Sequence, residues 1–202
     1  MIFRNILEAV FGSPAKIRIL RVLFVAPQPL SGRQVGELAR LSHRGAIQAL
    51  GPLVESGAVQ QRKVGKAYQY SLVRNNAVVK KIILPCIQAE ASLIDILKRD
   101  LKAHFGRNTV SLTLYGSLAR GGEQWGSDID VLAIARHGSM RTQLEEKAES
   151  LTSLYRQRYH ALLSLHCYAL SDLKDKKTLP LLRSILKEGI TISGKPLREI
   201  IA

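Results

Sequence analysis

The sequence is poor in the features that mark several common classes of protein. Its two cysteines, Cys86 and Cys167, form no Cys-x-x-Cys pair, so neither a zinc site nor a disulfide framework is expected, and both thiols are predicted to be buried and reduced. No uncharged apolar run approaches the roughly 20 residues that a membrane-spanning helix requires, and the first residues lack a secretory signal pattern. We therefore expect a cytoplasmic protein without membrane association, large enough to bury two modest cores.

Acidic residues are also scarce, and the resulting charge is unevenly distributed. The chain has 16 Asp and Glu against 30 Lys and Arg, which gives a net charge of +14. Residues 1–85 contain 13 basic and 3 acidic residues and so carry +10 of that charge, whereas residues 86–202 carry only +4. An asymmetry of this kind predicts an N-terminal module that binds a polyanion.

The pattern within this basic half predicts three helices followed by a hairpin. The helices are expected at about 13–26, 31–38 and 42–56, and each begins with serine, a residue type favoured at helix N-caps. Two short strands, at 58–63 and 67–73, follow the third helix. The apolar residues of the third helix that are expected to face inward are Ile47, Leu50, Leu53 and Val54.

This order of elements resembles the winged helix-turn-helix of bacterial and archaeal transcription regulators. The resemblance rests on Ser-His-Arg at 42–44 and on the segment 57–66, and it implies duplex DNA as a partner. In that docking geometry the third helix reads base edges, while basic side chains of the wing meet phosphates. A protein-interaction or dimerisation module, or a surface for structured RNA such as tRNA, are the alternatives. The predicted DNA-binding residues are Ser42, His43, Arg44, Gln48, Arg62, Lys63 and Lys66.

The most informative stretch of the second half is a Gly116-Ser117 pair followed, after ten residues, by Asp128 and Asp130. The preceding run, 110–115, predicts a buried strand that ends in a tight turn, and Ser117 is expected to cap a short helix whose N–H groups suit phosphate. Acids two apart on a strand point to one face, with Cα atoms about 6–7 Å apart. Such a pair binds Mg²⁺, which also binds nucleotide triphosphates. The alternative is a capped turn with solvated acids.

From about residue 87 to residue 202 the chain resembles the nucleotidyltransferase superfamily related to DNA polymerase beta, most closely its minimal nucleotidyltransferase branch. The resemblance implies Mg²⁺-dependent transfer of a nucleoside monophosphate from an NTP to a hydroxyl, with two metal ions stabilising the attacking and leaving oxygens. Analogy with this branch favours a protein acceptor or a toxin-like partner. The implied nucleotide-binding residues are Gly116, Ser117, Arg120 and Ser127, and the implied metal ligands are Asp128 and Asp130.

One departure from the family pattern concerns catalysis. The family usually has a third carboxylate on a later strand, and the matching strand here, 161–170, has His166 at that position. His166 is therefore predicted as a catalytic residue beside Asp128 and Asp130, acting as general base. It is alternatively a buried histidine in a site that binds nucleotide without catalysis, in which case the protein is a nucleotide-sensing transcriptional regulator. In a third alternative Asp172 supplies the missing acid.

The whole sequence predicts an α+β protein of two domains. Residues 1–85 are expected to form the winged helix-turn-helix, and residues 86–202 a small mixed sheet packed with helices. A linker helix at about 76–105 is expected to kink or break at Pro85. The apolar residues before Pro85, from Val78 to Ile83, are expected to pair with a second copy in a homodimer, which would match the two-fold symmetry of DNA half-sites.

Overall fold

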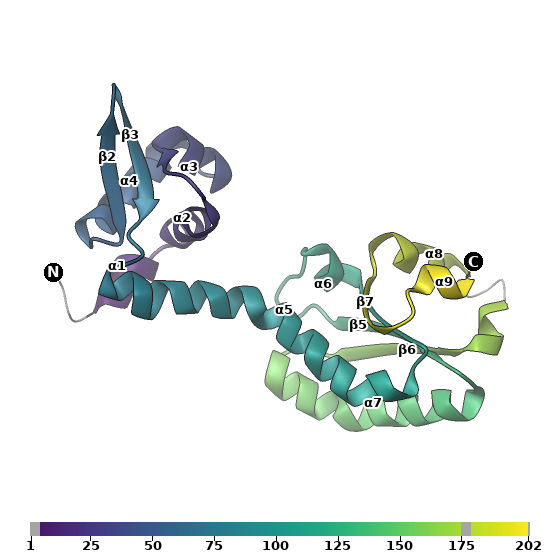
Figure 1. Cartoon of the computed structure of the whole chain (residues 1–202). Helices are drawn as coiled ribbons and strands as arrows, with labels where there is room; N and C mark the ends of the chain where they lie inside the picture. Colours follow the sequence, from purple (N-terminus) through teal and green to yellow (C-terminus); the bar gives the residue numbers. More distant parts are fainter. Residues whose placement is uncertain (1–4, 175–178, 202) are drawn as a thin grey trace. The chain divides into compact units, whose positions relative to one another are not determined.

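The computed structural model describes residues 5–174 and 179–201, which form two compact units, Met1–Leu93 and Ile94–Ala202. Both units combine helices with a small sheet, so the predicted α+β class is confirmed (Figure 1). The predicted functional boundary after residue 85 stays a prediction. No helix among the described residues is long and apolar enough to cross a membrane.

The helices of the first unit begin where serine satisfies their free N–H groups. The side chain of Ser13 accepts a hydrogen bond from the backbone N–H of Lys16, and Ser42 accepts one from Gly45. Ser31 forms a reciprocal capping box with Gln34. The three predicted helix starts are thereby confirmed. The helices are α1 (Ile6–Phe11), which was not predicted, α2 (Pro14–Val25), α3 (Gly32–Leu38) and α4 (His43–Glu55).

The hairpin of the first unit is the wing of a winged helix-turn-helix. Strands β2 (Val59–Val64) and β3 (Ala67–Leu72) pair antiparallel, and Gly65 turns between them with φ of 59°. A short strand, β1 (Leu30–Ser31), pairs with the other edge of β3 to give the order β1-β3-β2. The β2–β3 hairpin extends beyond the helices of its unit (Figure 1). The fold of the first unit is thus the one the sequence predicted.

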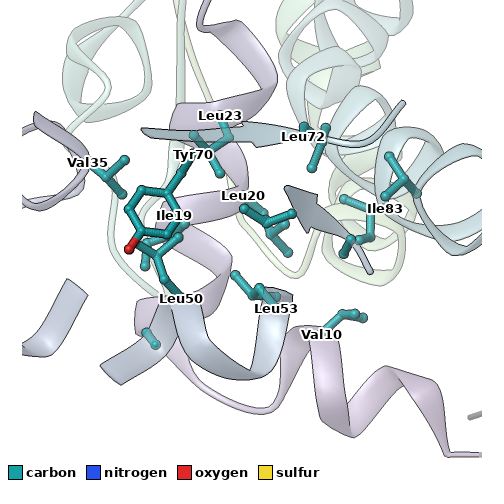
Figure 2. Close-up of a cluster of buried hydrophobic side chains, with 14 of the residues drawn as sticks. Val10, Ile19, Leu20, Leu23, Val35, Leu50, Leu53, Tyr70, Leu72 and Ile83 are labelled. Carbon is teal, nitrogen blue, oxygen red and sulfur yellow. The ribbon is translucent and has the colours of Figure 1, made fainter. Parts of the chain in front are cut away.

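The core of the first unit draws apolar side chains from its helices and from the wing, as Figure 2 shows. One prediction about α4 was wrong, because Ile47 is 40% exposed while Ala46 and Ala49 are buried. Small alanines allow α4 to lie close to its neighbours, which turns Ile47 to the edge of the buried face. Buried residues of this core include Val10, Ile19, Leu20, Leu23, Val35, Leu50, Leu53, Tyr70 and Leu72.

The linker helix does not break at Pro85. A π-helical turn, η1 (Val79–Ile83), passes directly into α5 (Leu84–Phe105), so Pro85 lies in the first turn of α5. A wider π turn shifts the carbonyl with which a proline ring would clash in a regular α-helix.

The apolar residues around this turn are also not free for dimerisation. Val78, Val79, Ile83 and Ile87 are buried in the core of the first unit. A dimer would have to use another surface, because these side chains are already covered by their own chain. The homodimer itself stays a prediction.

The second unit contains the predicted mixed sheet, in the order β6-β5-β4-β7. The pair β5–β6 is parallel, whereas β4 pairs antiparallel with both β5 and β7. The parallel pair is connected by a long helix, α7, as a parallel connection requires. The bounds are β4 (Ser111–Tyr115), α6 (Gly116–Arg120), β5 (Ile129–Ala135), α7 (Gly138–Tyr159), β6 (Leu163–Ala169) and β7 (Ile190–Gly194).

Helices cover both faces of this sheet (Figure 1). One face packs Leu112, Leu114 and Val131 against α7 and the last turns of α5. The other face packs Leu132 and Ile134 against α8 (Leu179–Glu188) and α9 (Leu197–Ile201). Two short 3-10 turns, η2 (Gly106–Asn108) and η3 (Leu170–Lys174), complete the described elements.

The two cysteines differ in their surroundings. Cys167 on β6 is buried, as predicted, and burial raises the pKa of its thiol to about 12. Cys86 is exposed, which contradicts the prediction, because it lies on the outward side of the first turn of α5.

Candidate functional site

The first component of the site is the turn between β4 and α6. Gly116 has φ of 76°, which favours glycine, and it starts α6 directly after Tyr115. A Cβ at position 116 would lie 2.2 Å from Oδ2 of Asp130, so the Asp130 carboxylate lies against the backbone of this turn. Ser117 does not cap the helix as predicted, because α6 starts one residue before it and Tyr115 is the N-cap residue.

The second component is the pair of acids at the start of β5. Asp130 pairs with Tyr115 across the sheet, and Asp128 precedes the strand by one residue. Burial, and then the negative charge of Asp128, raise the pKa of Asp130, while His166 and Arg120 act in the opposite direction. The structure therefore brings Asp128, His166 and Arg120 close enough to Asp130 to affect its charge.

The third component is His166, which the sequence placed in this site and which the structure brings there. It lies on β6 opposite Leu132 of β5 and is exposed, so the alternative of a buried histidine is wrong. Its Nδ1 lies 2.7 Å from the hydroxyl oxygen of Tyr115, and the two rings meet edge to face. The prediction placed no acid at this position, and the strand presents none.

Tyr115 is the residue that sequence reasoning missed. Burial, then the charge of Asp130, raise the pKa of its hydroxyl to about 12, so it stays protonated near neutral pH. In the sequence, the signal that could have placed Tyr115 in the site was its position at the end of the predicted strand, directly before Gly116. Its contact with His166 joins residues 51 positions apart and is set by strand order, which local sequence does not reveal.

Asp172 is not part of this site. Its carboxylate accepts hydrogen bonds from the backbone N–H of Ala169 and from Arg141, and these contacts lower its pKa. Ala169 lies at the end of β6 that is opposite to Ser164, the residue paired with Asp130. The alternative in which Asp172 supplies the third acid is therefore wrong.

The two remaining predicted phosphate ligands already have partners in the protein. Arg120 forms an ion pair with Glu188 at the end of α8, with 2.6 Å between Nη1 and Oε1. The hydroxyl of Ser127 accepts a hydrogen bond of 2.9 Å from the backbone N–H of Gln124 and so shapes the loop before Asp128. Both residues lie in the segment that joins the turn to the acids.

The residues of the site suit Mg²⁺ that arrives with a nucleotide. Within residues 5–174 and 179–201, no three His, Cys, Asp or Glu side chains are grouped closely enough to form a complete metal site. Mg²⁺ commonly uses only one or two carboxylates, and takes its other ligands from phosphates and water. Asp128 and Asp130 fit that role. Burial, and then repulsion by Asp128, raise the pKa of Asp130, and a cation would relieve this repulsion.

The predicted DNA-binding residues of the first unit lie on two exposed segments. The helix α4 presents one set and the β2–β3 hairpin presents the other, and Ile47 adds an exposed apolar side chain to the helix. The hydroxyl of Ser42 already accepts a hydrogen bond from the backbone N–H of Gly45, because Ser42 is the N-cap of α4. The residues of the two sets, all exposed, are Ser42, His43, Arg44 and Gln48 on the helix side, and Arg62, Lys63 and Lys66 on the hairpin.

This fold and this site define an α+β protein with a winged helix-turn-helix unit and a mixed-sheet unit of the nucleotidyltransferase type. Residues 94–192, which make up most of the second unit, match the nucleotidyltransferase domain family. No curated protein matches the chain.

Several solved structures resemble parts of the chain. A MarR-family transcriptional regulator from Silicibacter pomeroyi is 20% identical, with a TM-score of 0.36, over 50% of this chain and 77% of that one. A toxin–antitoxin structure with AMP-PNP is 17% identical, with a TM-score of 0.35, over 53% of this chain and 79% of that one. A mutant of the MntA–HpeT toxin–antitoxin is 14% identical, with a TM-score of 0.33, over the same shares of the two chains.

Proposed function

We propose that this protein is a DNA-binding nucleotidyltransferase that moves a nucleoside monophosphate from an NTP to a hydroxyl acceptor in the presence of Mg²⁺. The observation that carries the proposal is the approach of the Asp130 carboxylate to the backbone of Gly116, within a domain of the nucleotidyltransferase family. The approach puts a metal-binding acid beside a turn with the conformation needed to receive phosphate.

Each residue of the site has a distinct proposed role. Asp128 and Asp130 hold Mg²⁺, which when bound neutralises the triphosphate and the charge that develops on the leaving pyrophosphate. The backbone N–H groups at Gly116 and Ser117 bind phosphate oxygens. Arg120 exchanges its Glu188 partner for phosphate when a nucleotide is present, since a triphosphate carries more negative charge than one carboxylate.

His166 is the proposed general base. If its Nδ1–H donates to the hydroxyl oxygen of Tyr115, its Nε2 is left free to accept a proton. The acceptor hydroxyl then attacks the α-phosphorus, its proton moves to Nε2, and the bond from the α-phosphorus to the pyrophosphate oxygen breaks. Tyr115 thereby positions the imidazole and selects its tautomer.

Transfer is tested by incubating the whole chain with α-labelled ATP, CTP, GTP or UTP, Mg²⁺ and candidate acceptors. The acceptors are proteins, including toxin-like partners, together with RNA and small molecules. We expect label to move to one acceptor and to be lost in Asp128→Asn and Asp130→Asn. Label that moves equally well with both variants would exclude this site.

The proposed partner of the first unit is duplex DNA. The support is a net charge of +10 on residues 1–85 together with exposed basic side chains on both α4 and the wing. The exposed methyl groups of Ile47 suit contact with a thymine methyl in the major groove. Binding of duplex DNA and of tRNA over a salt series tests this, because a specific duplex binder keeps its preference as salt rises. Stronger binding to tRNA throughout would contradict it.

A second candidate is a transcriptional regulator that binds nucleotide without turnover. It is favoured by His166, which occupies the place where the family usually has a third carboxylate. The regulator predicts that Mg²⁺ and an NTP change the affinity for DNA while the NTP stays intact. An unchanged DNA affinity would count against it, and transfer of label would favour the enzyme.

A further inference from the structure

The protein has a single tryptophan, Trp125, and its side chain is 99% exposed. It lies in the loop 121–127, between α6 and Asp128. A large aromatic side chain usually buries most of its surface, and full exposure forgoes the free energy that burial would supply. An indole in this state, next to a proposed ligand site, is available to a binding partner.

Backbone hydrogen bonds shape the loop that carries Trp125 near both of its ends. At its start, the backbone N–H of Gly122 donates to the carbonyl of Ser117, at 3.0 Å. At its end, Gln124 and Ser127 exchange two hydrogen bonds of 2.9 Å, one backbone to backbone and one to the serine hydroxyl. Trp125 is inside this hydrogen-bonded turn, so the backbone positions the indole although no side chain packs on it within the described residues.

The surroundings of Trp125 favour a small flat ligand over a protein surface. The cores of protein interfaces are built from several apolar side chains around an anchor. The other loop residues are glycine, Glu123, Gln124 and Ser127, so the indole has no apolar neighbour along this loop. One isolated ring matches one nucleobase, which offers a single π-face of comparable size.

The position of Trp125 in the chain also fits a nucleotide. It precedes Asp128 by three residues, a separation that extended chain spans in about 10 Å at most. A base on Trp125 and phosphates beside Asp128 and Gly116 would therefore belong to one nucleotide.

We propose that Trp125 stacks on the base of the nucleotide whose phosphates bind at Gly116, Asp128 and Asp130. The inference rests on the proposed nucleotide site and deepens it, since it names the residue that contacts the base. Stacking is tolerant of base identity, but purines overlap the indole more than pyrimidines do. The site therefore prefers ATP and GTP over CTP and UTP.

The single tryptophan makes the test direct, because all indole fluorescence of the chain comes from this loop. Whole protein is titrated with Mg²⁺ and ATP, GTP, CTP, UTP or inorganic tripolyphosphate. Saturable quenching is expected with the nucleotides, at lower concentrations of ATP and GTP, and no quenching with tripolyphosphate, which has no base. Equal quenching by tripolyphosphate would overturn the proposal.

Variants complete the test by equilibrium dialysis with labelled ATP. Trp125→Ala is expected to weaken ATP binding about 5- to 100-fold and tripolyphosphate binding not at all, whereas Trp125→Phe keeps most of the affinity. Because the indole is exposed, folding should be unaffected, which a melting curve checks. Unchanged ATP affinity in Trp125→Ala would overturn stacking alone, while absence of ATP binding to the wild type would overturn the nucleotide site as well. A fluorescence change caused only by a protein or RNA acceptor would contradict stacking and assign Trp125 to the acceptor.

Discussion

At the scale of single residues, the site depends on one position without a side chain. Gly116 combines φ of 76° with a carboxylate oxygen where its Cβ would be. The sequence predicted the turn at Gly116 from its place after a strand. It could not predict that Asp130 lies against this turn, because that contact follows from strand pairing.

Gly116→Ala is expected to destabilise the second unit by about 1–3 kcal/mol and to remove nucleotide binding, because the new methyl group displaces Asp130 and strains the backbone. The measurements are denaturant unfolding and equilibrium dialysis. Gly122→Ala is the matched control, since a Cβ there meets no described atom within 4 Å. If both variants bound nucleotide like the wild type, the close approach would have no functional importance.

Asp130→Asn is expected to raise the melting temperature of the protein at neutral pH, although it removes function. The pKa of Asp130 is raised by folding, so the native state holds this proton more tightly than the unfolded state. Ionisation therefore costs stability, and this cost is present above the raised pKa and lost as pH falls through it towards pH 3. The amide avoids that cost, and the gain should vanish in acid.

Melting curves between pH 3 and pH 8 measure this effect. Mg²⁺ should raise the melting temperature of the wild type more than that of Asp130→Asn, because the variant has lost a ligand. Glu149→Gln, on the exposed side of α7, is the control and should leave the melting temperature unchanged. A lower melting temperature for Asp130→Asn at pH 8 would contradict the origin assigned to the shift.

At the scale of elements, the sequence predicts best where a local signal is sufficient. The helices α2, α3 and α4 start after the serines that cap them, because each cap lies three residues from its partner. The strand β1 has only two residues and exists through pairing with β3, so no pattern reveals it. The continuation of the helix past Pro85 needs the preceding π turn, which proline statistics do not predict.

The wing is expected to contribute affinity for DNA without sequence preference. Replacing Arg62, Lys63 and Lys66 together by glutamine should reduce the slope of log K against log salt by about 3, if each contacts one phosphate. The measurement is fluorescence anisotropy of labelled duplex at several salt concentrations. The control replaces the exposed Lys80 and Lys81 by glutamine, outside the wing and α4, and should keep the slope. Equal slopes for all three proteins would show that the wing does not touch DNA.

At the scale of the whole molecule, one helix belongs to both units. The residues Ile83 and Ile87, at the start of this helical segment, lie in the first core, and Leu97 and Leu101 lie in the second. The sequence predicted a helical, apolar linker between two modules, but it expected a kink or break at Pro85, where the helical segment continues. This helix is the covalent connection between the two units.

If α5 transmits binding, Mg²⁺ and ATP should change the affinity for DNA by roughly 5- to 150-fold, and DNA should change the affinity for ATP by the same factor. Replacing the exposed Ala89 and Ala91 by glycine costs helix stability of about 1 kcal/mol each and should reduce this factor while each ligand still binds. Ala103→Gly, at the other end of α5, is the control. Titrations of each ligand with and without the other measure the factor, and a factor of 1 in the wild type would contradict transmission through α5.

The central claim is that Gly116, Asp128 and Asp130 form a site for a nucleotide with Mg²⁺. Its most direct test is equilibrium dialysis of the whole chain with labelled ATP, with Mg²⁺ and then with EDTA, in the wild type and in Asp128→Asn/Asp130→Asn. We predict saturable binding that needs Mg²⁺ and is lost in the double variant, while Glu149→Gln binds like the wild type. Binding that is equal in the wild type and the double variant, or no binding to the wild type, would contradict the claim.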